Sequence, residues 1–86
     1  MNVQIVYFWP DDWCIADRKH NPEDGNFLTK DFRWVDCDSD SFLRNAVYSS
    51  REKAEEHFKN WLNTLPKAKA NRIFACYIAN RLCSNG

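Results

Sequence analysis

Residues 6–17, VYFWPDDWCIAD, are the stretch that decides the fold. Aromatic and β-branched residues are dense over residues 2–9, which is typical of a β-strand. Pro10 suits the second position of a tight turn, and aspartates such as Asp11 and Asp12 are frequent beside it. The residues WCIAD then favour a returning strand. The sequence therefore predicts an N-terminal β-hairpin with an acidic turn.

The first predicted strand is apolar on both faces. Because side chains alternate across a strand, Val6 and Phe8 lie opposite a second set, which is Val3, Ile5, Tyr7 and Trp9. Two apolar faces favour a central place in the sheet. The returning strand should bring Trp13 near Trp9.

Downstream of the hairpin the pattern is less regular. Residues 18–26 form a polar stretch that carries turn residues and predicts a loop. Residues 32–36, FRWVD, alternate well enough for a third short strand. Residues 42–48 remain ambiguous between a strand and a short helix.

The clearest helix signal follows. Ser49 and Glu52 have the spacing of a capping box, with Ser49 as the N-cap. Pro66 ends the helix near Thr64. Oppositely charged residues four apart should pair on the solvent-exposed face of this helix, Arg51 with Glu55 and Glu55 with Lys59. The apolar stripe of this helix is Ala54, Phe58, Trp61, Leu62 and Leu65.

Residues 69–83 favour a second helix over the alternative, a buried strand. The apolar positions recur at helical spacing and are Ala70, Ile73, Phe74, Tyr77, Ile78 and Leu82. The predicted fold class is α+β, a small antiparallel sheet packed on one or two C-terminal helices.

Length and composition predict one ordered domain over residues 1–86. Thirteen aromatic residues against two glycines and three prolines argue against disorder. The N-terminus lacks the basic segment of a signal peptide, and no apolar run is long enough to span a membrane. We therefore expect a cytoplasmic protein with reduced cysteines and no membrane partner.

The formal net charge is zero, but the charges are unevenly distributed. Residues 1–50 hold nine acids and five bases, whereas residues 51–86 hold three acids and seven bases. Such asymmetry can steer a partner, or it can reflect two halves that pack together. The second interpretation is the simpler one.

No motif predicts a metal, a cofactor or a catalytic centre. The candidate ligands Cys14, Cys37, Cys76, Cys83, His20 and His57 lack the close pairs of a zinc site. Cys76 and Cys83 are better interpreted as small core residues. Asp36, Asp38 and Asp40 begin like a calcium loop, but Ser41 and Val47 replace the glycine and glutamate that such a loop needs.

A catalytic interpretation has little support. Cys14 or a serine would need His20 or His57 as a base, and His57 is better interpreted as a boundary residue of the helix. Phosphate-binding glycine patterns are absent from the sequence. We therefore expect a protein that is not an enzyme.

Nucleic-acid binding is the alternative hypothesis. Lys67, Lys69 and Arg72, with Arg81 further along, make the C-terminal half basic, and Lys69 and Arg72 should share a helix face. Phe74 and Tyr77 lie between them but match the apolar stripe. A neutral chain has little excess charge for phosphate, so this partner is less expected than a protein.

A protein-binding surface is the preferred hypothesis. If helices cover only one face of the sheet, tryptophans would remain exposed on the other, although they could instead complete the core. The predicted contact set is Trp9, Asp11, Asp12, Trp13 and Trp34, with rings as anchors and carboxylates steering toward a basic partner surface. A homodimer would use the same surface.

In size and aromatic content the whole chain resembles the small accessory proteins of bacteriophages and mobile elements. That resemblance implies an inhibitor that blocks a host complex, such as a nuclease or a CRISPR complex, by occupying its surface.

Overall fold

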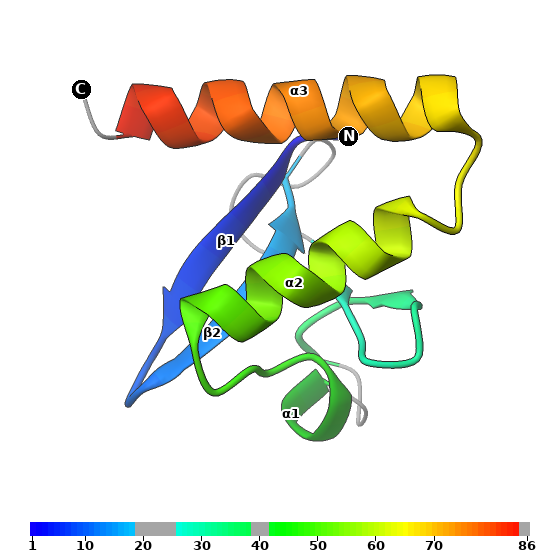
Figure 1. The fold of residues 1–86 in the computed structure, drawn as a ribbon. Helices are drawn as coiled ribbons and strands as arrows, with labels where there is room; N and C mark the ends of the chain where they lie inside the picture. The colour runs from blue at the N-terminus through cyan, green and yellow to red at the C-terminus, as the bar shows by residue number, and fades with distance from the viewer. Residues whose placement is uncertain (19–25, 39–41, 85–86) are drawn as a thin grey trace.

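The computed structural model describes residues 1–18, 26–38 and 42–84, and in these residues four strands precede three helices (Figure 1). The strands pair antiparallel in the order β1-β2-β3-β4. The predicted α+β class is confirmed. The strands are β1 (Val3–Phe8), β2 (Asp12–Asp17), β3 (Asn26–Leu28) and β4 (Trp34–Val35), and the helices are α1 (Phe42–Asn45), α2 (Arg51–Leu62) and α3 (Lys67–Ser84).

The N-terminal hairpin forms as the sequence predicts. In its register Ile5 lies opposite Ile15 and Tyr7 lies opposite Trp13. The expected neighbour of Trp13 was Trp9, but the ring beside it is Tyr7, at 5.6 Å between centroids. The last paired residues are Phe8 and Asp12, so Trp9 lies in the turn between the strands and not opposite Trp13.

The central position predicted for the first strand is wrong, because β1 is an edge strand. Both faces of β1 are apolar because helices cover the sheet above and below, and not because β1 has a strand on either side. Val3 and Ile5 belong to the core under α2 and α3, whereas Val6 and Phe8 pack on the opposite core. Apolar faces require cover above and below a sheet, and an edge strand satisfies that requirement equally well.

The sheet is therefore covered on both faces. On one face α2 and α3 pack over a core that contains Phe58 and Tyr77. On the other face a smaller cluster contains Phe42 of the short α1, Ala46 just after it, and Phe27. The expectation that one face would stay open is corrected by this second cluster.

β3 and β4 complete the sheet. The third strand predicted over residues 32–36 is shorter and is β4, whereas β3 was not predicted. Asn26, expected in a loop, begins β3, and the rest of that loop beyond Arg18 lies outside the described residues. Between the two strands Phe32 adopts φ 64°, and its N–H donates to the Thr29 carbonyl at 3.1 Å. This tight connection joins strands too short for clear alternation.

Residues 42–48, which the sequence left ambiguous, contain both a short helix and a β-bridge. α1 covers the first four of them, and Tyr48 then forms an isolated antiparallel bridge with Trp13. The Tyr48 hydroxyl also donates to the Leu28 carbonyl at 3.0 Å. A short helix and a single bridge give no pattern long enough to identify from sequence.

Helix α2 forms as predicted, with one correction at its start. The N-cap is Ser50, whose hydroxyl accepts from the Lys53 N–H at 3.1 Å, and so the predicted capping box on Ser49 is wrong by one residue. The helix ends at Leu62, two residues before Thr64. Its apolar stripe is buried as expected, with Leu65 half-buried beyond the helix end.

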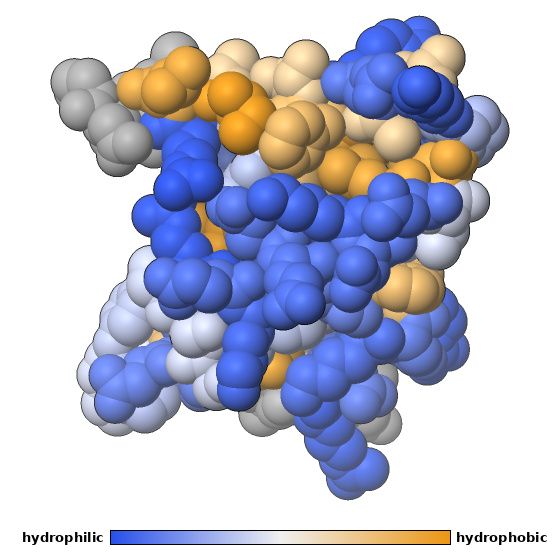
Figure 2. Space-filling model, in the orientation of Figure 1, coloured by the Kyte–Doolittle hydropathy of each residue, from blue (hydrophilic) through white to orange (hydrophobic). Residues whose placement is uncertain are grey.

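The C-terminal segment is a helix, as preferred. α3 crosses the sheet near the start of β1 (Figure 1), and Ile73 and Tyr77 enter the core. Two predictions of burial are wrong: Leu82 is 68% exposed, and Cys76 is exposed. Both follow because only one side of α3 packs against the sheet and α2, and Figure 2 shows hydrophobic residues at the surface along α3.

Candidate functional site

The hairpin tip carries the most exposed aromatic residues in the described part of the chain. Trp9 is 80% exposed and Tyr7 is 54% exposed. The Tyr7 hydroxyl donates to the Pro10 carbonyl, and its ring meets Trp13 edge to face. These contacts hold the turn in place, and the indole of Trp9 projects from it into solvent. We call Tyr7, Trp9, Asp11, Asp12 and Trp13 the tip surface.

The predicted contact residues differ in their exposure. Asp11 is exposed beside Trp9, and Asp12 is half-buried. Trp13 is half-buried against the core under α2 and α3, and the Arg51 guanidinium carbon lies 5.8 Å from its ring centroid. These residues come from one hairpin, which places them together.

Trp34 lies apart from the tip surface. It belongs to β4, at the other edge of the sheet, and its ring meets Trp61 edge to face at 5.2 Å between centroids. The ring packs on the core under α2 and α3, and its Nε1 is buried without a hydrogen-bond partner. The structure therefore does not bring Trp34 together with the other four residues.

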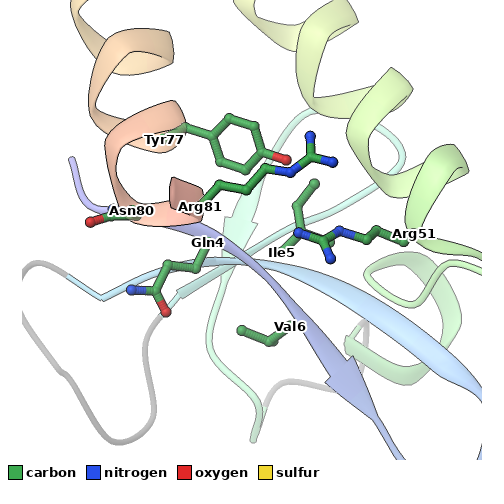
Figure 3. Close-up of a pocket in the computed structure, with 7 residues that line it drawn as sticks. All are labelled: Gln4, Ile5, Val6, Arg51, Tyr77, Asn80 and Arg81. Carbon is green, nitrogen blue, oxygen red and sulfur yellow. The ribbon is translucent and has the colours of Figure 1, made fainter. Parts of the chain in front are cut away.

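A cavity beside β1 was not anticipated from the sequence. Its volume is about 240 Å³, and Figure 3 shows its lining residues from three separate elements. They are Gln4, Ile5, Val6, Arg51, Tyr77, Asn80 and Arg81. From the sequence Arg51 and Arg81 are only charged residues on two separate helices. That both line one cavity depends on how α2 and α3 pack together.

Glu55 joins the two helices that wall this cavity. Its carboxylate accepts from the Tyr77 hydroxyl at 2.7 Å and pairs with Arg81 at 2.9 Å and Lys59 at 3.3 Å. The predicted Glu55–Lys59 pair is therefore present. The predicted Arg51–Glu55 pair is not among the ion pairs of the described residues, because Arg51 lies over the Trp13 ring.

The Glu55 network predicts a specific pH dependence of stability. The Tyr77 hydrogen bond, aided by Lys59 and Arg81, holds the pKa of Glu55 below its ordinary value. A carboxylate with a lowered folded pKa stabilises the fold above its unfolded pKa of about 4.3, and this contribution is lost as the pH falls through the folded value. We expect Glu55→Gln to cost about 1–2 kcal/mol at neutral pH.

Urea unfolding of both proteins at several pH values, from neutral to below the ordinary pKa of glutamate, checks this expectation. The difference in free energy of unfolding between Glu55→Gln and the native chain should shrink as the pH falls. The similarly charged change Glu52→Gln, on the exposed side of α2, is the control. A difference that stays constant with pH would contradict a role for the ionised carboxylate.

The candidate nucleophile and base do not meet. Cys14 is buried on the face that α1 covers, and burial, with a smaller contribution from Asp12, raises the pKa of its thiol to about 11. His57 is on α2, on the other face, where its Nε2 lies 3.0 Å from the Thr29 carbonyl and its ring stacks on Phe32. Its predicted boundary position is confirmed. His20 lies outside the described residues.

The candidate metal ligands are dispersed over the described parts of the chain. Within these ranges no three His, Cys, Asp or Glu side chains are placed to hold an ion. An Asp36 carboxylate oxygen instead accepts from the Asp38 N–H at 3.0 Å, which is a local turn bond. Asp40 and the Cys83 side chain lie outside the described residues.

The alternative nucleic-acid residues are on the surface of α3. Lys67, Lys69 and Arg72 are exposed, and the last two line a hollow beside Met1 and Ile73, so they share a face. Tyr77 is in the core and its pKa is raised to about 12 by burial and by Glu55. It is not available for base stacking.

In the described residues no helix has the length and apolar character needed to cross a membrane. Comparisons of the chain with protein-family models, curated proteins and solved structures find no match.

Proposed function

We propose that this protein is a non-catalytic protein-interaction module that docks through its tip surface. The observation that carries the proposal is Trp9, which leaves 80% of its surface exposed at the end of a hairpin. Exposing so large an apolar ring is unfavourable in water unless a partner covers it. Tryptophan is also the residue type most enriched in binding hot spots.

The construction of the tip supports this role. Tyr7, Pro10 and Trp13 hold the turn through a hydrogen bond and an edge-to-face ring contact, so little conformational entropy remains to be lost on binding. Asp11 beside the indole favours a partner with a basic surface. Such a module acts by occupancy, and the proposal includes inhibition of a host nuclease or CRISPR-type complex.

Trp9→Ala is the variant that tests the proposal. Loss of a hot-spot tryptophan should weaken partner binding by about 30-fold or more, while stability changes by less than about 0.5 kcal/mol because the ring is exposed. Tagged native protein and variant are used to capture partners from nuclease-treated bacterial lysate. Affinity is then measured by calorimetry with the purified partner.

Leu82→Ala is the matched control, because Leu82 is a similarly exposed apolar residue on a different element. Equal binding by the native chain and Trp9→Ala would contradict docking through the tip surface. Capture of nucleic acid alone, lost in Lys69→Glu with Arg72→Glu, would favour the basic face of α3 instead. A concentration-dependent dimer that Trp9→Ala abolishes would make the partner a second copy.

A further inference from the structure

The outer edge of β1 has backbone groups that can accept another strand. Trp13 and Tyr48 exchange both backbone hydrogen bonds at 2.8 Å, so the Trp13 N–H and C=O point away from β1. Tyr7, which faces Trp13 in the register, is then in a non-hydrogen-bonded pair, and its own N–H and C=O point outward. By the two-residue alternation the same holds for Ile5.

This edge is unpaired in the described part of the chain. β1 ends the strand order, and the backbone hydrogen bonds between the described segments include none from Ile5 or Tyr7. Edge strands with open backbone groups are templates for pairing with another chain. The edge also runs directly into the tip surface, since Tyr7 belongs to both.

The cavity beside β1 adds side-chain selectivity to this edge. Gln4, Ile5 and Val6 line it from the strand, and since they alternate between faces, the hollow follows the strand edge. Figure 3 shows the guanidinium groups of Arg51 and Arg81 entering it from α2 and α3. A side chain from an added strand would therefore meet apolar groups of Ile5 and Val6 and the guanidinium groups of the two arginines.

The two arginines differ in their availability. Arg81 is paired with Glu55 at 2.9 Å. The Arg51 Nε is buried with no hydrogen-bond partner, and its guanidinium lies over the Trp13 ring. Arg51 as a whole is half-buried and takes part in none of the ion pairs of the described residues, and a carboxylate is the group that matches a guanidinium best.

We infer that the open edge of β1 binds an extended segment of a partner protein as an added strand, with an acidic side chain of that segment on Arg51. This inference rests on the proposed role as an interaction module and specifies the form of its partner. Backbone pairing with Ile5 and Tyr7 supplies sequence-independent affinity. The cavity supplies selectivity for the carboxylate.

A second copy of the chain fits this edge poorly. Figure 1 shows the C-terminal half of α3 running out past the start of β1, on the side away from β2. We expect such a projecting helix on each copy to hinder the pairing of two β1 strands. An extended segment carries no helix of this kind.

The test uses a blocked eight-residue peptide of alternating threonine and valine with a central glutamate, titrated into the ¹⁵N-labelled full chain. We expect amide shifts at Ile5 and Tyr7, and about tenfold tighter binding than the same peptide with a central lysine, which is the effect of one charge-assisted contact. Arg51→Gln should abolish this preference. Lys53→Gln, the same charge change on the outer side of α2, should retain it.

Two results would overturn the inference: equal affinity of the glutamate and lysine peptides for the native chain, or shifts that avoid Ile5 and Tyr7. The peptide comparison on the native protein stands even if Arg51→Gln is destabilised. A result that rejects strand addition at β1 can be distinguished from one that rejects docking through the tip surface. A captured partner lost with Trp9→Ala but bound normally by Arg51→Gln would keep the tip surface and reject the acidic strand.

Discussion

Replacing Phe58 with alanine should lower the free energy of unfolding by about 3–5 kcal/mol, the range for a buried phenylalanine. Phe58 has no exposed surface, and its ring lies 5.0 Å from Tyr77 and 6.2 Å from Trp61 between centroids. Alanine would leave a void where α2, α3 and the sheet meet. A domain of this size has about 4–13 kcal/mol in total, so the variant should be largely or partly unfolded at 37 °C.

Urea unfolding followed by tryptophan fluorescence and by far-ultraviolet circular dichroism measures this loss. Phe58→Leu is the companion variant, because it keeps most of the apolar volume and should cost less than the alanine change. Trp9→Ala supplies the surface reference. A loss below about 1 kcal/mol for Phe58→Ala would show that the helices do not pack on the sheet as described.

Replacing Phe42 with alanine should cost about 3 kcal/mol, at the lower end of the same range. Phe42 is buried on the other face of the sheet, with ring centroids 5.5 Å from Phe8 and 4.8 Å from Phe27. This second cluster is small and its helix α1 has four residues, so neighbouring side chains can close part of the void.

The same unfolding experiment distinguishes a true second core from a loosely covered face. Arg44→Ala, on the exposed side of α1, is the control and should change stability by less than about 0.5 kcal/mol. If Phe42→Ala behaved like this control, the face of the sheet under α1 would be open. The aromatic surface first expected there would then return as a candidate interface.

Elements with a strong local signal were predictable from the sequence. The hairpin follows from Pro10 between two runs of strand-forming residues, and α2 follows from its apolar spacing. The error at its N-cap, Ser49 for Ser50, arises because adjacent serines offer the same hydroxyl and only the backbone conformation selects one. Residues 69–83 were correctly assigned as helix, although their apolar run also suits a strand.

The candidate site was only partly predictable. Trp9 and Asp11 are exposed, as the preferred hypothesis expects, but Trp9 is exposed because it lies in the turn and not because a face of the sheet is open. Trp13 and Trp34 have the same residue type and a similar sequence context, yet both rings pack on the core under α2 and α3. Composition shows how many rings a chain must bury, but it does not show which positions the helices reach.

The sequence by itself determined the hairpin with its acidic turn and the helix α2, since each depends on interactions within a few residues, and it favoured helix over strand for residues 69–83 and hence the α+β class. Only the tertiary structure decided that β1 is an edge strand, that α1 closes the second face, and that Arg51 and Arg81 meet beside Ile5. These outcomes depend on contacts between segments far apart in the chain. No local period or turn motif records such contacts, because their free energy arises only when the elements have packed together.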